Sequence, residues 1–583
     1  MAKPKLGRFV LVLHSHLPFV VNHGKWPHGM EWLFEAASET YIPILNVLNE
    51  LVRDGRKPRL TMSVTPVLAE QLASPQFVTE FDRFLDEEIE RAVEDINLFT
   101  DSSEEKPFLP LAHFWKNFYE GIKKDFVERY NRDLVGAFRS LQENAVLDIM
   151  TCGATHGYFP LLSQDSSIRA QIKTAISTHQ KHFKRKPRGI WLPECAYRPR
   201  YPWKPPIPSE LGDQRYFRQG VEELLDENGL EYFIVDSSLV QGGKAVGIYM
   251  GRFESLRNLM QQFEKEAAFK ALPDGPHSVY EVYNTKSSVE SPAQPVAIFA
   301  RDVETSMQVW SSEQGYPGGE WYLDFHKKHH QSGHRYWRVT SLDADLGLKV
   351  QYQPSRIAGA LDADADHFVQ SIKSALEKFK NAEGFEGTLT APFDAELFGH
   401  WWFEGPEFLR RVFERLEDDG EIMITNCSGH LDEHPPEKII AIPEGSWGAG
   451  GSHYVWMNHE VSWMWNFIYR DELEFQKHIR QWNGQSNEKW IWILKQMARE
   501  LLLLQASDWQ FLISTESAID YAIKRFSEHQ TAFDKLGALS QKLASATGLS
   551  PEDETWLQQL KETDFLFDDA SIDLLWFSGN QTS

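Results

Sequence analysis

The sequence has little cysteine, no long apolar run and no excess of basic residues. Its three cysteines, Cys152, Cys195 and Cys427, provide neither a disulfide framework nor the close spacing of a cysteine metal site. No apolar run approaches the roughly 18 residues that a membrane-spanning helix needs. A net charge of −24 disfavours nucleic acids and anionic membrane surfaces as partners, because both require clustered Lys and Arg.

These absences indicate a cytoplasmic protein. The amino-terminal residues lead into an apolar strand rather than into the core of a signal peptide, and free cysteines are typical of a reducing compartment. We expect no nucleic-acid partner, no membrane partner, and a monomer or a homodimer. The acidic balance suits a neutral ligand such as a polysaccharide.

Aromatic residues, in contrast, are abundant. The chain of 583 residues contains 20 Trp, 18 Tyr and 37 Phe. Many of these rings are expected in the core, where buried aromatics contribute strongly to stability. Because the flat C–H faces of sugar rings pack well on indoles, the number of tryptophans also indicates a glucan-binding cleft.

Short apolar runs alternate with longer helical stretches, as in a parallel sheet covered by helices. Residues with acid, base or imidazole groups stand directly after these runs, which is the position of active sites in (β/α) barrels. An open twisted sheet would follow a similar rule. The predicted strands are residues 8–13, 59–64, 146–152, 189–192, 232–235, 296–300, 388–392 and 421–425.

Two domains are predicted. Residues 1–440 form the catalytic domain, with a charged helical insertion at about 75–140 and a glycine-bordered loop region at about 240–275. Residues 441–583 contain no convincing strand and form a helical C-terminal domain. The length suits one large catalytic domain with a smaller second one.

Two carboxylates end two of the apolar runs. Glu194 follows the run at 189–192, and Asp394 follows the run at 388–392. Taken singly, each is best interpreted as a cap or a surface charge. Together, with aromatic neighbours, they provide the pair of acids that cleavage or transfer of a glycosidic bond requires.

Five motifs occur in a fixed order along the chain. They are His-Ser-His-Leu-Pro at 14–18, Cys-Gly-Ala-Thr-His-Gly-Tyr-Phe-Pro at 152–160, Trp-Leu-Pro-Glu-Cys-Ala-Tyr at 191–197, Phe-Asp-Ala-Glu-Leu-Phe-Gly-His-Trp-Trp at 393–402 and Pro-Glu-Gly-Ser-Trp-Gly at 443–448. In order and type they resemble the conserved regions of glycoside hydrolase family 57. The motifs at 194–197 and 394–402 are most similar to its 1,4-α-glucan branching enzymes, as are Ala-Arg-Asp at 300–302 and Ala-Ser-Asp-Trp at 506–509.

The resemblance implies an α/β fold, an incomplete (β/α)7 barrel followed by an all-helical domain. One of the eight predicted strands is then wrong or peripheral. It also implies a retaining reaction in which Glu194 is the nucleophile and Asp394 is the acid/base. Such a reaction needs carboxyl groups about 5–5.5 Å apart. Glu396 is the alternative acid/base, but the family pattern favours the first acid of Asp-Ala-Glu.

Three histidines allow two interpretations. His14, His16 and His156 follow predicted strands, and such a set is compatible with a zinc site. The resemblance instead implies that they bind sugar hydroxyls and the nucleophile, with no metal and no cofactor. For His16, a third interpretation is that it only ties strand ends together. Cys195 has no paired histidine motif and is interpreted as a space-filling residue.

Further residues are predicted to bind the glucan. Arg301 and Asp302 follow a strand, and Asp508 is expected to reach the cleft from the helical domain. Tyr249, near the tip of the loop at 242–251, is hypothesised to cover the donor site and to favour transfer over hydrolysis. The predicted aromatic platforms are Trp26, Trp310, Trp402, Trp447, Trp456 and Trp509, with Trp32 as a further wall residue.

We therefore predict a 1,4-α-glucan branching enzyme that makes α-1,6 branches in a glycogen-type polymer. A 4-α-glucanotransferase or an α-amylase of the same family is the nearest alternative, since it differs only in the acceptor. A metal-dependent polysaccharide deacetylase is a distant alternative, suggested by the three histidines. A glucan-binding protein without catalysis is the non-enzyme alternative, and the presence of both acids argues against it.

Overall fold

Seven parallel strands form the central sheet of the protein. The computed structural model describes residues 5–25, 27–242, 275–288, 290–311, 315–341 and 344–578. The strands follow one another in the order β10-β1-β2-β3-β4-β7-β9. They are β1 (Gly7–Ser15), β2 (Leu60–Val64), β3 (Leu147–Cys152), β4 (Gly189–Trp191), β7 (Tyr232–Val235), β9 (Val296–Ala300) and β10 (Gly387–Asp394).

The sheet curls into an incomplete barrel. One isolated parallel bridge, Arg301 to Thr390, brings the end of β9 next to β10, and the Asp302 amide donates to the Thr390 carbonyl at 2.9 Å. The predicted (β/α)7 barrel is thereby confirmed. Because few backbone hydrogen bonds join β9 to β10, the barrel is closed only weakly between these two strands.

All eight predicted strands are present, and the eighth is peripheral, as expected. It is β11 (Ile422–Thr425), which pairs only with the first four residues of β1. The prediction omitted four short strands. Two of them lie at the edge of the sheet: β8 (Tyr283–Thr285) is antiparallel to β9, and β12 (Ile439–Ile440) pairs in parallel with β8. The other two, β5 (Tyr201–Trp203) and β6 (Tyr216–Arg218), form a separate hairpin.

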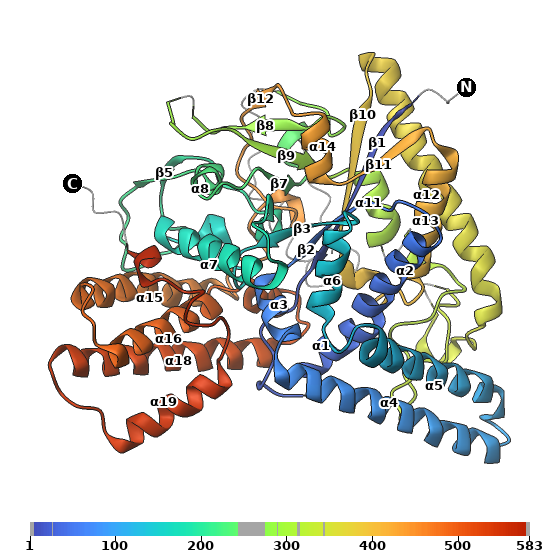
Figure 1. Cartoon of the computed structure of the whole chain (residues 1–583), viewed down its shortest axis with the longest axis horizontal. Helices are drawn as coiled ribbons and strands as arrows, with labels where there is room; N and C mark the ends of the chain where they lie inside the picture. Colours follow the sequence, from blue (N-terminus) through green and yellow to red (C-terminus); the bar gives the residue numbers. More distant parts are fainter. Residues whose placement is uncertain are drawn as a thin grey trace.

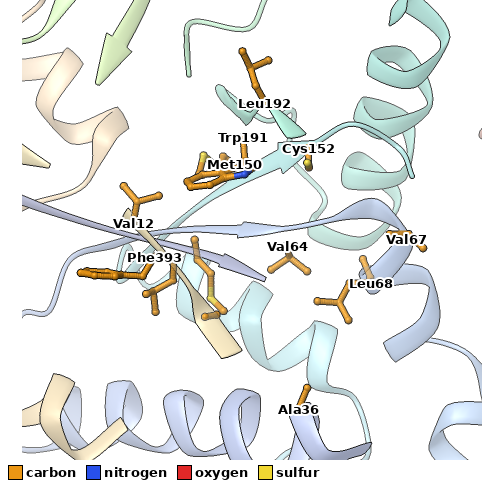
Figure 2. Close-up of a cluster of buried hydrophobic side chains, with 14 of the residues drawn as sticks. Val12, Ala36, Val64, Val67, Leu68, Met150, Cys152, Trp191, Leu192 and Phe393 are labelled. Atoms are coloured by element: carbon orange, nitrogen blue, oxygen red, sulfur yellow. The ribbon is translucent and has the colours of Figure 1, made fainter. Parts of the chain in front are cut away.

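The barrel strands are apolar because helices and the barrel interior cover both of their faces. All nine residues of β1 are buried, as expected for a parallel strand without a solvent face. Figure 2 shows part of the resulting core, in which side chains of several neighbouring strands gather. Its labelled members include Val12 of β1, Met150 of β3, Trp191 of β4 and Phe393 of β10.

Helices surround the barrel (Figure 1). Long ones end at residues in the left-handed region, such as Lys184 after α7 and Gly384 after α12, which is a frequent way to end a helix. The barrel helices are α1 (Met30–Ala36), α2 (Ile42–Arg53), α3 (Pro66–Leu72), α6 (Leu134–Glu143), α7 (Asp165–Phe183), α8 (Val221–Glu227), α9 (Ser238–Gln241), α11 (Val303–Trp310), α12 (Pro354–Glu383), α13 (Gly405–Asp419) and α14 (Cys427–Glu433).

Two helical parts lie beside the barrel. Between β2 and β3, α4 (Pro75–Asp101) and α5 (Leu109–Lys124) pack against each other at one side of the molecule (Figure 1). After β12, the described chain has no further strand. The helices there gather at the other side, and they are α15 (Ser462–Trp482), α16 (Glu488–Leu504), α17 (Asp508–Ser514), α18 (Ile519–Ala544) and α19 (Pro551–Thr563).

Within the described residues, no helix is both long enough and apolar enough to cross a membrane.

Candidate active site

One cavity of about 570 Å³ collects residues from the carboxyl ends of the barrel strands. Glu194 and Asp394 both line it, although 200 positions separate them in the sequence. His14, His16 and His156 line it as well. The strand-end rule therefore brought the predicted acids and histidines to one place. Residues of the helical insertion and of the C-terminal helices complete the wall.

Glu194 stands on a strained turn. Its φ is +61°, and that of the following Cys195 is +47°, in the left-handed region that residues other than glycine seldom occupy. Three backbone hydrogen bonds hold the turn: Cys195 N–H to the Leu192 carbonyl, Trp447 N–H to the Glu194 carbonyl and Tyr197 N–H to the Gly445 carbonyl. Such strain is typical of functional sites, and here the segment around 445–447 maintains it.

His156 is held in the same way. Its φ is +59°, and its carbonyl accepts from the Ser507 amide at 3.0 Å. The segment that clamps it precedes α17 in the C-terminal region. Two strained residues of the barrel, Glu194 and His156, thus depend on segments that come much later in the chain.

The Glu194 carboxylate accepts two side-chain hydrogen bonds. The Trp447 indole N–H donates to Oε2 at 2.8 Å, and the Ser507 hydroxyl donates to Oε1 at 3.4 Å. The His156 Nδ1 atom lies 3.9 Å from Oε1. These groups stabilise the carboxylate anion and fix its orientation, as a nucleophile requires.

A chain of hydrogen bonds runs behind the nucleophile. His14 Nδ1 lies 3.1 Å from Ser63 Oγ, His14 Nε2 lies 3.1 Å from His156 Nε2, and His156 Nδ1 lies 2.7 Å from Ser507 Oγ. Since the Ser507 hydroxyl donates to Glu194, His156 must donate from Nδ1 and accept at Nε2. His14 then donates from Nε2 and accepts at Nδ1 from Ser63.

This chain requires both histidines to be neutral. Burial lowers the pKa of His14 and of His156 well below the ordinary value, and the charge of His16 lowers both further. Every donor in the chain then points toward Glu194, because each ring carries a single N–H. The histidines thus act as neutral hydrogen-bond donors that support the nucleophile.

The C-terminal region contributes a further carboxylate to the cavity, that of Asp508. The His16 Nε2 atom lies 3.0 Å from Asp508 Oδ1, and its Nδ1 atom lies 3.2 Å from the Thr65 hydroxyl. Asp508 lines the cavity together with Phe511 and Leu512. The expectation that Asp508 reaches the cleft agrees with this position.

Burial strongly affects the nucleophile. Burial in the first place, and then the charges of Asp394 and Asp508, raise the pKa of Glu194 to about 8, against the Trp447 N–H, which lowers it. Because the charge of Asp394 contributes to this shift, ionisation of one of these two cavity acids opposes ionisation of the other.

Glu396, the alternative acid/base, is occupied by other partners. Its Oε1 atom accepts from the Tyr41 hydroxyl at 2.5 Å and from the His16 amide at 3.2 Å. Burial, and then the charge of Asp394, raise its pKa to about 8. With Oε1 held in this way, Glu396 is less available than Asp394 for proton transfer to a substrate.

The predicted aromatic platforms divide into two groups. Trp310 and Trp447 line the cavity. Trp402, Trp456 and Trp509 do not line it in the described structure, and each is at most 1% exposed. Trp456 stacks on Tyr158, and Trp509 donates to a backbone carbonyl. The substrate role predicted for these three is corrected to packing, since their faces are covered by protein.

Arg301 and Asp302 are also buried next to the cavity without lining it. Arg301 forms a buried ion pair with Asp236 at 2.5 Å, and neither Arg301 nor Asp302 lines the cavity of the described structure. The Asp302 side chain caps α11 by accepting from the Thr305 amide, so it positions the helix that ends at Trp310. The sugar contact predicted for Arg301 and Asp302 is therefore corrected to a supporting structural role.

Trp26 and Tyr249 lie outside the described residues, and so does the hypothesised loop at 242–251 apart from Gly242. Cys195 is buried, and burial raises the pKa of its thiol well above the ordinary value. A protonated, enclosed thiol is a poor nucleophile, which agrees with the space-filling interpretation.

The sequence interpretation missed several cavity residues. Ser507 belongs to the quoted motif at 506–509 but received no role. Others lie on α1 and the π-helical turn that follows it, on the helical insertion, on the loop at 325–335, or shortly after β10. These missed residues are Glu35, Glu39, Trp115, Tyr119, Phe325, Arg335 and His400.

Two groups of cavity residues have metal-like spacing. The ligand atoms of His16, His156 and Asp508 lie within 4.8 Å of one another, as do those of His14, Cys152 and His156. In both groups the histidine nitrogen atoms already have hydrogen-bond partners. The donor chain described above uses both nitrogens of His14 and of His156, which favours hydrogen bonding as their function.

Comparison with known proteins gives a consistent result. The glycosyl hydrolase family 57 model matches residues 10–443, and the model described as 1,4-alpha-glucan branching enzyme, C-terminal, matches residues 468–576. The 1,4-alpha-glucan branching enzyme TK1436 of Thermococcus kodakarensis is 39% identical over 559 residues, which cover 96% of this chain and 77% of that protein.

Solved structures agree with the sequence matches. The crystal structure of TK1436 has a TM-score of 0.87 at 38% identity and covers 99% of this chain and 97% of its own. A branching enzyme of this type from Pyrococcus horikoshii has a TM-score of 0.84 at 36% identity, covering 99% and 98%. The α-amylase AmyC from Thermotoga maritima has a TM-score of 0.78 at 29% identity, covering 100% of both chains.

Proposed function

The chain belongs to glycosyl hydrolase family 57, and from this premise we propose that Glu194 and Asp394 catalyse a retaining transfer between α-glucan chains. The protein is a 1,4-α-glucan branching enzyme, which cleaves an α-1,4 linkage and joins the released segment to a 6-hydroxyl group. The observation that supports the mechanism best is that both carboxylates line one cavity with indole walls. Formation of branches in a cytoplasmic, glycogen-type polymer is the physiological part of the proposal.

The first half-reaction breaks the donor linkage. Glu194 attacks the anomeric carbon, while Asp394 gives its proton to the departing O4 atom. The bond between the carbon and O4 breaks as the bond to Glu194 forms. The Trp447 N–H and the Ser507 hydroxyl hold the attacking carboxylate in place, which reduces the entropic cost of reaching the transition state.

The second half-reaction forms the branch. Asp394, now ionised, removes the proton from a glucan 6-hydroxyl, whose oxygen attacks the anomeric carbon and displaces Glu194. Two inversions restore the α configuration. The His14–His156–Ser507 chain stabilises Glu194 as it leaves with a negative charge, because all of its donors point toward the carboxylate.

Amylose provides the test of the function. The purified protein is incubated with amylose, and the product is then debranched and compared with an untreated control. We expect new α-1,6 linkages and shorter chains after debranching. Free reducing ends without new branches would instead identify the hydrolase, an outcome that the similarity to the α-amylase AmyC makes the relevant second candidate. Elongated linear chains would identify a 4-α-glucanotransferase.

The raised pKa of Glu194 predicts the acid limit of activity. Glu194 must be ionised to attack the anomeric carbon. Because its folded-state pKa is raised to about 8, the attacking carboxylate forms as the pH rises toward 8, and kcat/KM should increase over that range. Trp447→Phe removes the N–H that lowers this pKa, so the acid limb of kcat/KM should move to higher pH. An acid limb that stays in place or moves down in this variant would contradict the assignment.

A further inference from the structure

Besides the residues around the catalytic pair, a second group of residues lines the cavity, and we call it the distal lobe. It is formed by Glu35, Glu39, Phe325, Arg335, His400 and Trp401, all of which line the same cavity as Glu194 and Asp394. None of these residues has a part in the mechanism described above. The distal lobe therefore needs its own explanation.

One short segment connects the distal lobe to the acid/base. Asp394 ends β10, and His400 and Trp401 follow it within seven positions. A π-helical turn (Ala37–Tyr41) packs against this segment, since the His400 amide donates to the Thr40 hydroxyl at 3.0 Å. The same turn carries both Tyr41, which donates to Glu396, and Glu39 of the lobe. Turns of this kind are frequent at functional sites. The distal lobe is thus built on the Asp394 side of the cavity, whereas the partners of Glu194 come from residues 445–447 and 507.

Fixed polar groups line the distal lobe. Arg335 donates to Glu39 at 2.7 Å, and His400 Nδ1 lies 3.4 Å from Glu39 Oε2. The Arg335 carbonyl accepts from the Trp115 indole at 2.7 Å, which anchors the loop to the helical insertion. Although burial opposes it, Arg335 and His400 keep the pKa of Glu39 below its ordinary value. An ionised, immobilised carboxylate is a good acceptor for hydroxyl groups.

An aromatic surface accompanies the polar groups. The rings of Phe325 and Trp401 lie 4.2 Å apart at an interplanar angle of 34°, and the edge contact between Phe325 and His400 measures 5.3 Å. Phe325 and Trp401 are only partly buried. A partly exposed aromatic surface beside oriented carboxylates suits a ligand with flat apolar faces and many hydroxyl groups, which describes a glucan chain.

The retaining mechanism indicates which glucan chain the distal lobe would bind. In a retaining enzyme the acid/base contacts the bridging oxygen, so the chain beyond that oxygen lies on the acid/base side of the sugar. The incoming hydroxyl must approach the same group. We propose that the distal lobe is the acceptor site, where a second α-glucan chain binds so that its 6-hydroxyl reaches Asp394. This inference rests on the proposed function, since a hydrolase uses water instead of a second glucan chain as the acceptor.

A pre-activated donor separates acceptor binding from branching as a whole. α-Maltotriosyl fluoride forms the glycosyl-enzyme with loss of fluoride, and added maltopentaose competes with water for it. For Phe325→Ala and His400→Gln, we expect the maltopentaose concentration at half-maximal transfer to rise about tenfold, equivalent to about 1.4 kcal/mol. Each variant is compared with its own hydrolysis of the fluoride, which corrects for altered amounts of folded protein.

Phe217→Ala is the matched control. Phe217 is a 69% exposed phenylalanine on the β5–β6 hairpin and does not line the cavity of the described structure. Its removal should leave acceptor use unchanged. Phe325→Tyr keeps a ring at the lobe and should restore the half-saturation of the parent. Circular dichroism of each variant checks folding, and His400→Gln serves if Phe325→Ala fails to fold.

The outcomes distinguish the inference from the function. If both distal-lobe variants use maltopentaose as well as Phe217→Ala does, the acceptor assignment is wrong while branching stands. If the parent enzyme transfers nothing to maltopentaose and makes no branches in amylose, the proposed function itself fails.

Discussion

Replacing Glu194 by Gln should abolish transfer and hydrolysis alike, lowering kcat on amylose by about 10⁴-fold or more, the scale of losing a catalytic nucleophile. The amide is close in size to the carboxylate, and its oxygen can still accept from the Trp447 N–H. It cannot attack the anomeric carbon, so no glycosyl-enzyme forms. Fluoride release from maltotriosyl fluoride should fall in parallel, because a better leaving group does not replace a missing nucleophile.

Rescue by azide distinguishes the loss of the nucleophile from unfolding of the variant. In a smaller variant, Glu194→Ala, azide can occupy the vacated space and attack the anomeric carbon directly. The product should then be the β-glycosyl azide, formed by a single inversion. An active Glu194→Gln enzyme would refute the assignment of the nucleophile, as would an α-azide from Glu194→Ala.

Asp394→Asn should behave differently, although it also inactivates the enzyme on amylose. Loss of general acid/base catalysis typically costs about 10²–10⁴-fold. Fluoride needs no proton to depart, so maltotriosyl fluoride should still glycosylate Glu194 at a substantial rate. Resolution of the intermediate lacks its base, and the glycosyl-enzyme should accumulate. We expect a burst of fluoride close to one equivalent, followed by slow turnover.

Glu396→Gln provides the comparison for the second acid. Glu396 lines the cavity but is held by Tyr41 and the His16 amide. Its amide variant should retain the need for Asp394 and show no burst. If instead Glu396→Gln accumulates the intermediate and Asp394→Asn does not, the acid/base roles must be exchanged.

The barrel could be predicted from sequence because its strands are buried on both faces. A run such as residues 9–13 is apolar throughout, and most of the predicted runs are followed closely by a residue with a candidate functional side chain. The short strands β8 and β12 carry no such pattern, since they have two or three residues and lie beside the barrel. The position of β11 follows from tertiary pairing with β1, which no local signal specifies.

The meeting of Glu194 and Asp394 in one cavity was predictable for the same reason, whereas the positions of several tryptophans were not. Trp447 and Trp456 are nearly identical in exposure, at 2% and 1%. Trp447 faces the cavity and donates to Glu194, while Trp456 stacks on Tyr158. Which face of an indole meets a cavity depends on packing between distant segments, and a linear pattern does not contain this information.

The distal lobe escaped prediction because its residues come from three unrelated elements. Glu39 lies on a π-helical turn, Arg335 on an irregular loop, and His400 within the motif at 393–402, where the two acids provide the chemical signal. Ser507 illustrates the same difficulty, because its importance follows from contacts with Glu194 and His156 that join the barrel to the C-terminal region.

The most direct test of the central claim is to locate the covalent intermediate. Asp394→Asn protein is mixed with maltotriosyl fluoride, quenched in acid and digested, and the peptides are analysed by mass spectrometry. A maltotriosyl group attached to Glu194 is the predicted result. Attachment to another residue, or no attachment despite the release of fluoride, would contradict the claim that Glu194 and Asp394 act on one sugar in a double displacement.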